Sequence, residues 1–203
     1  MTPRFITLDG IDGTGKSTQC RLLADWLRGR GVDVVTCRDP GGTPLGDALR
    51  SILLEQRIDR TATAEAMLFM ASRAELVARV IRPALDRGAW VISDRYLLAT
   101  VVYQGYGGSL NPDDLWAVGR VATGGTEPDL TLVLDLPVDA AVARRGRSPD
   151  RIEERDRAFH ERVRRGFLKE AARKGNIIQV VDATPEIAAI HAAIRTAVEP
   201  LFG

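Results

Sequence analysis

The chain of 203 residues is 45% hydrophobic and 27% charged, which fits one globular domain with a full core and excludes a disordered or fibrous chain. Its 28 basic and 27 acidic residues leave a formal net charge of +1, so no general attraction to nucleic acid or to an anionic membrane surface is expected. Cys20 and Cys37 form neither a CxxC pair nor a disulfide framework, and two histidines are too few for a structural zinc site.

The N-terminal sequence MTPRFITLDG enters a strand-like run at once, without the basic and apolar segments of a signal peptide. No run in the sequence reaches the roughly 20 apolar residues that a membrane-spanning helix needs. We therefore expect a cytoplasmic protein that does not bind membranes.

Short apolar runs bounded by turn residues alternate with longer segments of helical period, which is typical of a parallel sheet covered by helices. The runs are apolar and β-branched nearly throughout, as strands that are buried on both faces should be. The expected strands cover residues 4–9, 33–37, 89–94, 130–136 and 176–182. The sequence therefore predicts an α/β fold.

Capping side chains followed by proline and an acidic residue mark three helix starts. These starts lie at 111–114, 148–150 and 184–186. The longest helical stretch runs from Thr63 to Arg87, ends at Gly88, and is expected to bend at Pro83. No repeat, low-complexity tract or linker divides the chain, so we expect one domain over residues 1–203.

The stretch GIDGTGKST, residues 10–18, matches the phosphate-binding P-loop pattern, directly after a strand and directly before an amphipathic helix. In such loops the backbone amides and the helix N-terminus hold the β-phosphate, the lysine reaches the β- and γ-phosphates, and the serine hydroxyl binds Mg²⁺. The expected ATP contacts are Gly10, Ile11, Asp12, Gly13, Thr14, Gly15, Lys16, Ser17 and Thr18.

The rest of the chain favours a kinase over a GTPase. A guanine-reading NKxD motif is absent, and the stretch Asp94-Arg95-Tyr96 stands where a GTPase carries its Asp-x-x-Gly switch. We therefore expect an enzyme that binds a second substrate beside ATP.

Four further segments carry a resemblance to a known family. They are RDPGGT at 38–43, LFMASRAE at 68–75, DRYLLATVVYQG at 94–105 and RRGRSPDRIE at 144–153. In this order after the P-loop, they resemble the thymidylate kinase family, whose members pass a phosphoryl group from Mg-ATP to dTMP. The resemblance implies the P-loop kinase fold, with a five-stranded parallel sheet between helices and a mobile lid at about 144–153, together with Mg²⁺ as cofactor and a homodimer.

Two arginines at strand ends are expected to bind the phosphate of the acceptor. Arg38 follows the second strand and Arg95 follows the third, at the edge where ligands gather on an open parallel sheet. A strand-end arginine is often only a solvated charge, but the Pro-Gly-Gly turn after Arg38 fixes its direction. The resemblance implies that both arginines grip the acceptor's phosphate, and that Asp94 lies near Mg²⁺ or serves as a general base.

Phe69 and Arg73 lie four residues apart, which places them on one helix face. A helical phenylalanine taken singly is more often a core residue. The family register of ASR favours stacking of Phe69 on a pyrimidine and donation by Arg73 to a ring carbonyl. Tyr103 and Gln104 match the family's YQG near the sugar and base, with Tyr103 as a wall against a ribose 2′-hydroxyl.

Two positions complete the acceptor site. Ala99 stands where the family often has a small polar residue, so the base contact of that residue is not carried over, although Thr100 follows it. Asp12 puts a carboxylate into a loop that holds phosphates, and the resemblance implies that it accepts from the deoxyribose 3′-hydroxyl. The expected dTMP contacts are Asp12, Arg38, Phe69, Arg73, Arg95, Thr100, Tyr103 and Gln104.

The lid segment is rich in arginine and is expected to close over ATP and bring charge to the transferring phosphoryl group. Its arginines are Arg144, Arg145, Arg147 and Arg151. Alignment on DRIE leaves Gly146 where a basic residue is expected, so Arg145 and Arg147 both stay candidates. The candidate catalytic residues are Lys16, Asp94, Arg95, Arg145 and Arg147, and the candidate metal ligands are Ser17 and Asp94.

Two alternatives stay open. One is a kinase for another nucleoside monophosphate or for a deoxynucleoside, although the pair Arg38 and Arg95 favours an acceptor that is already phosphorylated. The other is a nucleotide-binding switch without transferase activity, against which the charged groups at several strand ends argue. No nucleic-acid recognition motif is present, so small-molecule substrates are the expected partners.

Overall fold

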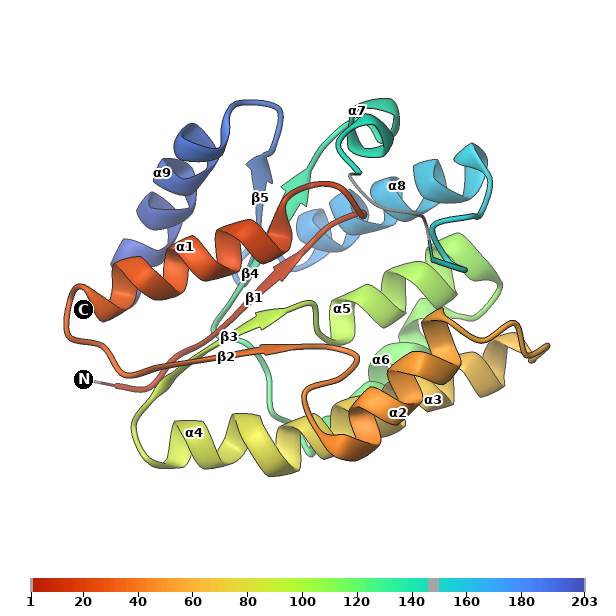
Figure 1. Ribbon diagram of the computed structural model, residues 1–203, viewed down its shortest axis with the longest axis horizontal. Coiled ribbons are helices and arrows are strands. Elements are labelled where there is room, and N and C mark those ends of the chain that lie inside the picture. Colours follow the sequence, from red (N-terminus) through yellow and green to blue (C-terminus); the bar gives the residue numbers. More distant parts are fainter. Residues whose placement is uncertain (1, 146–149, 203) are drawn as a thin grey trace.

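Five parallel strands form the centre of the protein in the computed structural model, which describes residues 2–145 and 150–202 (Figure 1). Their order across the sheet is β2-β3-β1-β4-β5. The strands are β1 (Phe5–Asp9), β2 (Val34–Arg38), β3 (Trp90–Asp94), β4 (Leu130–Asp135) and β5 (Ile178–Asp182). The predicted α/β class and all five predicted strands are confirmed.

Helices cover both faces of this sheet (Figure 1). The α-helices are α1 (Lys16–Arg28), α2 (Pro44–Leu54), α3 (Ala62–Leu76), α4 (Arg82–Asp86), α5 (Leu97–Thr100), α6 (Pro112–Thr123), α7 (Val138–Ala143), α8 (Arg157–Arg173) and α9 (Ile187–Val198). Two segments are π-helical, η1 (Val77–Ile81) and η2 (Val101–Gly108), and η3 (Glu199–Phe202) is a 3-10 helix. None of the helices in the described ranges is long and apolar enough to cross a membrane.

Alternate residues of β1 belong to two different apolar clusters. Ile6 and Leu8 are fully buried with Leu23 of α1 and Ile194 of α9. Phe5 is buried in the cluster built from α3, α4 and α6, where its ring meets Tyr96 edge-on with centroids 4.9 Å apart. This double burial explains why the strand sequences are apolar at nearly every position.

The long helical stretch predicted over 63–87 is real but changes type along its length. Helix α3 passes into the π-helical turn η1 and then into α4, which ends before Gly88 at a φ of 88°. The π-helical turn lies just before Pro83, whose missing N–H cannot continue the regular hydrogen-bond ladder. The expected irregularity at this proline therefore takes the form of a widened turn.

One predicted helix start is confirmed and another is displaced. Asn111 caps α6, and its side chain accepts a hydrogen bond from the Asp113 amide at 2.9 Å. The start predicted at 184–186 is wrong, because α9 begins at Ile187. The Thr184 amide instead donates to the Asp182 side chain at 2.8 Å, which makes a separate turn between β5 and the helix.

The third predicted start, at 148–150, is also wrong as far as the described residues show. Ser148 and Pro149 lie outside the described residues, while the Asp150 side chain accepts from the amides of Ile152 and Glu153 and closes a turn. Helix α8 begins only at Arg157, after the capping side chain of Asp156. An Asx turn and a helix cap share one local sequence signature.

Candidate active site

The carboxyl ends of three neighbouring strands bring the predicted site residues together. Arg38 at the end of β2 pairs in register with Asp94 at the end of β3, and Asp94 pairs with Leu8 of β1. The P-loop follows β1 directly and leads into α1. The phosphate-binding loop and both strand-end arginines thus start from the same edge of the sheet.

Two P-loop glycines are required by close backbone approach. Gly10 has a φ of 128°, and a Cβ atom there would lie 2.4 Å from the Leu134 carbonyl oxygen. Gly13 has a φ of 90°, and its Cβ would lie 2.0 Å from the Ala141 carbonyl oxygen. Any side chain at either position would displace the loop from the strand and helix behind it.

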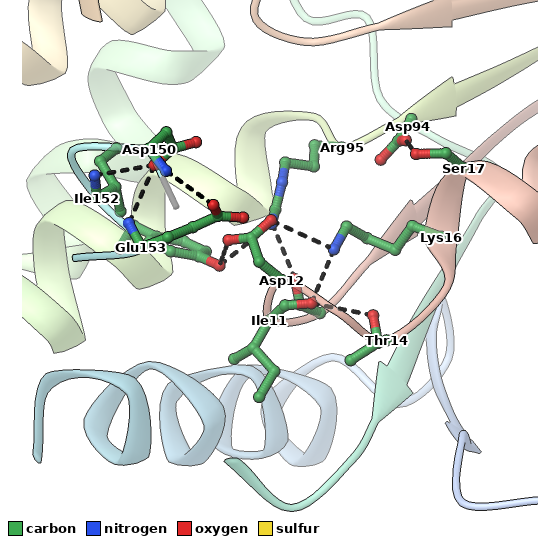
Figure 2. A network of polar contacts seen from close by, with 12 residues as sticks. Ile11, Asp12, Thr14, Lys16, Ser17, Asp94, Arg95, Asp150, Ile152 and Glu153 are labelled. Atoms are coloured by element: carbon green, nitrogen blue, oxygen red, sulfur yellow. Dashed lines mark hydrogen bonds and ion pairs between the residues drawn. The ribbon is translucent and has the colours of Figure 1, made fainter. Parts of the chain in front are cut away.

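Lys16 is buried, and its side chain points toward Asp12 and the Ile11 carbonyl (Figure 2). Its Nζ donates to the Ile11 carbonyl at 2.8 Å, and it is 3.9 Å from the Asp12 carboxylate. Burial, and next the nearby Arg95 charge, lower the pKa of Lys16. A backbone carbonyl is a neutral partner, so an arriving phosphate oxygen can replace it.

The two candidate metal ligands contact each other. The Ser17 hydroxyl donates to an Asp94 carboxylate oxygen at 2.5 Å (Figure 2). The described part of the chain holds no group of three or more His, Cys, Asp or Glu side chains that could bind a metal ion by itself. One hydroxyl and one carboxylate fit Mg²⁺, which binds few protein ligands and completes its shell with water and phosphate oxygens.

A cavity of about 530 Å³ lies over the P-loop and is rich in cationic side chains. Lys16, Arg38, Arg95 and Arg145 all line it. The Nε and one terminal nitrogen of Arg145 have no hydrogen-bond partner among the described residues, while its other terminal nitrogen donates to the Glu153 carbonyl at 3.3 Å. Arg147, the other candidate of the lid, lies outside the described residues.

A second cavity, of about 90 Å³, adjoins the first, and Asp12 and Arg95 line both. Its remaining walls include every residue predicted for the base and sugar: Phe69, Arg73, Thr100, Tyr103 and Gln104. Phe69 also belongs to the hydrophobic core, so the core role and the cavity role coexist in one side chain. Of the expected dTMP contacts, only Arg38 lies in the larger cavity alone.

Asp12, Arg95 and Tyr103 form a compact triad between the cavities (Figure 2 shows the first two). Arg95 donates to Asp12 at 2.6 Å and to the Tyr103 hydroxyl at 3.1 Å, and Tyr103 donates to the other Asp12 oxygen at 2.9 Å. Burial alone would raise the pKa of Asp12, but the charges of Arg95 and Lys16 and these hydrogen bonds hold it well below its usual range. The carboxylate inside the P-loop is thus neutralised by Lys16 of the same loop and by Arg95 after β3.

Arg95 itself has a backbone conformation that non-glycine residues rarely adopt. Its φ is 69°, with its amide donating to Leu8 at 2.9 Å and its carbonyl accepting from the Ser93 hydroxyl at 2.7 Å. Such conformations concentrate at functional sites, where the surrounding contacts hold them in place. The strain turns the guanidinium of Arg95 back over the P-loop, where it donates to the Gly10 carbonyl at 2.9 Å.

Arg73 is fully buried against Asp39. Its Nε donates to the Asp39 carboxylate at 2.5 Å, and a terminal nitrogen donates to the Thr100 hydroxyl at 2.9 Å. Burial raises the pKa of Asp39, against the opposing effect of Arg73. Asp39 lies inside the RDPGGT segment, yet nothing in its residue type or spacing marked it as the partner of a residue 34 positions away.

Arg50 is a further site residue that the sequence did not reveal. It lies on α2, lines both cavities, and donates to the Pro40 carbonyl at 2.8 Å. Burial and the neighbouring charge of Arg38 lower the pKa of Arg50. A single arginine on an amphipathic helix carries no signal that separates it from an ordinary exposed charge.

Comparisons with known proteins agree with this geometry. The family model described as thymidylate kinase matches residues 8–194. A thymidylate kinase of Rhodopirellula baltica is 48% identical over 195 residues, covering 95% of this chain and 80% of that protein. A thymidylate kinase of Cupriavidus metallidurans is 45% identical over 203 residues, covering 99% of this chain and all of that protein.

Among solved structures, the crystal structure of thymidylate kinase from Ehrlichia chaffeensis superimposes with a TM-score of 0.81 at 30% identity, covering 98% of this chain and 99% of that one. The strand order and the parallel sheet between helices are therefore those of a P-loop kinase. The chain belongs to the thymidylate kinase family, the enzymes that transfer a phosphoryl group from ATP to dTMP.

Proposed function

We propose that the two adjoining cavities hold the two nucleotides with their phosphates facing each other. The observation that carries this proposal is the shared lining: Lys16, Arg38 and Arg95 face one cavity, and Arg95 also closes the end of the smaller cavity. Two anionic phosphate groups repel strongly at short distance, so their close approach requires cations between them. The side chains at the junction supply that positive charge.

On the donor side, the amides of the P-loop and Lys16 bind the phosphates of ATP. Lys16 exchanges the Ile11 carbonyl for phosphate oxygens. Ser17 and Asp94 hold Mg²⁺, which neutralises phosphate charge when it is bound. The Ser17 hydroxyl and the Asp94 carboxylate support this placement of the metal.

On the acceptor side, the base enters the small cavity against Phe69, with Arg73 and Thr100 at its polar edge. Asp12 and Tyr103 face the sugar, where the carboxylate accepts from the 3′-hydroxyl and the ring leaves no room for a 2′-hydroxyl. Arg38, Arg50 and Arg95 hold the phosphate of dTMP.

The transfer is direct and in line, without a covalent intermediate on the enzyme. Positioning and charge stabilisation therefore supply the catalysis. Arg145 lines the larger cavity, has two nitrogens without a hydrogen-bond partner among the described residues, and is our candidate for charge supplied by the lid at about 144–153. Arg147 stays a second candidate.

Three wider properties are also proposed, the homodimer from the family resemblance and the other two from the amino-acid sequence. The chain works as one domain over residues 1–203, it pairs as a homodimer, and it acts in the cytoplasm on small-molecule substrates. Sedimentation of the purified enzyme tests the dimer, and a monomer at micromolar concentration would contradict it.

Coupled turnover with a panel of nucleoside monophosphates tests the acceptor assignment. We expect ADP release with Mg-ATP to depend on dTMP and to be faster with dTMP than with CMP, UMP or AMP. Faster turnover of any of those three would overturn the assignment of the small cavity to a thymine nucleotide.

A further inference from the structure

Glu65 is a buried carboxylate that lies behind the acceptor cavity. It stands in the first turn of α3 and is only 9% exposed, and it lines a separate cavity of about 460 Å³ rather than the acceptor cavity. Gln104 lies in the wall between the two, because it lines both cavities. One carboxylate oxygen accepts from Nε2 of Gln104 at 3.0 Å, and the other contacts a terminal nitrogen of Arg151. Both partners of Glu65 therefore use nitrogen donors.

Arg151 is fixed independently of Glu65. Its Nε donates to the Leu53 carbonyl at 3.1 Å, and its amide donates to the Leu54 carbonyl at 3.3 Å, both at the end of α2. A guanidinium donates in a rigid fork and has no acceptor atom. Arg151 therefore holds the carboxylate of Glu65 in one position.

The position of Glu65 determines which way round the Gln104 amide lies. An ionised carboxylate can only accept, so the amide must turn its NH₂ group toward Glu65 and its carbonyl oxygen away. The reverse orientation would set two acceptor oxygens against each other. Oε1 of Gln104 has no hydrogen-bond partner among the residues that the structure describes, and Gln104 lines the acceptor cavity. This orientation follows from the chemistry of Glu65, whichever way an amide is drawn.

A carbonyl oxygen in the cavity wall selects among pyrimidines. N3 of thymine and of uracil carries a hydrogen, whereas N3 of cytosine carries a lone pair. Ala99, in the same wall, has no hydrogen-bonding side-chain group, so the Gln104 amide has more influence on base choice in this chain. We propose that Glu65 is a positioning residue that makes the site read thymine or uracil and reject cytosine, by fixing the amide orientation of Gln104.

This inference rests on the proposed placement of the acceptor base in the small cavity. The test compares kcat/KM for dTMP, dUMP and dCMP in the wild-type enzyme and in Glu65→Gln. A glutamine at 65 offers both a donor and an acceptor, so it pairs with either orientation of Gln104. We expect the dTMP-to-dCMP ratio to fall at least about tenfold.

The dTMP-to-dUMP ratio should stay unchanged, because both bases carry the same N3–H. General structural damage would instead lower turnover of all three substrates together. An unchanged dTMP-to-dCMP ratio in Glu65→Gln would overturn the inference.

Glu154→Gln is the matched control. Glu154 belongs to the same segment as Arg151 and pairs with Arg57 at 2.9 Å, but this pair is exposed and lines neither cavity. We expect its dTMP-to-dCMP ratio to equal that of wild type. An equally large change in this control would show that any disturbance of the segment alters specificity, and it would overturn the inference.

Gln104→Met separates the inference from the proposed function. If Gln104 faces the base, this variant lowers kcat/KM for dTMP, and adding Glu65→Gln to it changes the ratio no further. Wild-type dTMP turnover in Gln104→Met would overturn the placement of the base itself. Reduced turnover in Gln104→Met with an unchanged ratio in Glu65→Gln would overturn the role of Glu65 alone.

Circular dichroism and the KM for ATP check that Glu65→Gln folds. If it does not fold, a crystal structure of the wild-type enzyme with dTMP gives a second measurement. We expect Gln104 Oε1 at about 3 Å from N3 of the base and Nε2 on Glu65. A base that lies away from Gln104, or an amide turned the other way, would overturn the inference.

Discussion

The donor and acceptor cavities differ in the groups that pair with their lysine and arginine side chains. On the donor side, Lys16 donates to a neutral backbone carbonyl inside its own loop. On the acceptor side, Arg73 donates to the buried carboxylate of Asp39 and Arg95 to the half-buried carboxylate of Asp12, and each carboxylate comes from a distant part of the chain. Substrate can replace the partner of Lys16 without disturbing the fold, whereas the acceptor arginines are part of what holds the fold together. Substitutions on the donor side should therefore lower activity without lowering stability, whereas substitutions in these ion pairs on the acceptor side should lower both.

Asp39→Ala should give the largest effect on stability. It leaves the fully buried guanidinium of Arg73 without its carboxylate. Removing one partner of a buried ion pair typically costs about 3–5 kcal/mol of unfolding free energy. Urea denaturation measures the loss, with Glu154→Ala as the control for an exposed pair that contributes about 1 kcal/mol or less. A loss for Asp39→Ala as small as that control would show that the acceptor pair is not structural.

Lys16→Ala should separate activity from stability. We expect kcat/KM to fall by the equivalent of about 2–4 kcal/mol, as for the loss of one strong transition-state contact. The unfolding free energy should change by less than about 1 kcal/mol, because Lys16 gives up one hydrogen bond to a backbone carbonyl and a 3.9 Å ion pair with Asp12, and its own burial is unfavourable. Steady-state kinetics and urea denaturation of the same preparation measure both quantities. Near-normal activity would contradict the role given to Lys16.

The same contrast explains what the sequence could and could not predict. The donor site is one contiguous loop whose glycines, lysine and serine are required by backbone geometry and phosphate chemistry, so nine neighbouring residues reveal it. The cavity that we assign to the acceptor is lined by residues of the P-loop, α2, α3, α5, η2 and the ends of β2 and β3. Family resemblance predicted its main residues, and all of these except Arg38 line the smaller cavity, while their contacts with dTMP stay a prediction.

The carboxylates that pair with the acceptor-site residues had no such signal in the sequence. Asp39 and Glu65 matter because folding places them beside Arg73 and beside Gln104, and neither neighbour is close in sequence. The misplaced helix start at 184–186 has a different origin, because its capping residues form a turn that precedes the helix. Local patterns indicate which side chains can cap, but tertiary packing decides where a helix begins.

Asp9 and Asp12 extend the comparison to two carboxylates three residues apart. Asp12 is paired with Arg95 and Tyr103, whereas neither carboxylate oxygen of Asp9 has a hydrogen-bond partner among the described residues. Burial raises the pKa of Asp9 from 3.8 to about 7, although Arg95 and Lys16 oppose the shift. The folded protein therefore binds this proton more tightly than the unfolded chain does.

The raised pKa of Asp9 can be tested by comparing the unfolding free energies of the wild type and Asp9→Asn as a function of pH. In the ligand-free wild type, the stability contributed by protonated Asp9 is full below about pH 4 and is lost as the pH rises through about 7. The wild-type unfolding free energy should fall relative to that of the variant by roughly 3 kcal/mol between about pH 5 and about pH 8. Urea denaturation at several pH values measures the difference. Parallel profiles for the two proteins would mean that Asp9 titrates normally in the folded state.

Arg50→Gln should give the smallest effect and shows where the two cavities meet. Arg50 lines both of them and is held by one hydrogen bond to the Pro40 carbonyl rather than by a buried carboxylate, so it resembles Lys16 more than Arg73. Its loss should therefore spare stability and raise the KM for dTMP about tenfold, which corresponds to about 1.4 kcal/mol. Arg57→Gln, in the segment just after α2, removes an exposed arginine that lines neither cavity and serves as the control. If Arg50→Gln raised the KM for ATP and left the KM for dTMP unchanged, Arg50 would bind the donor nucleotide and not the acceptor.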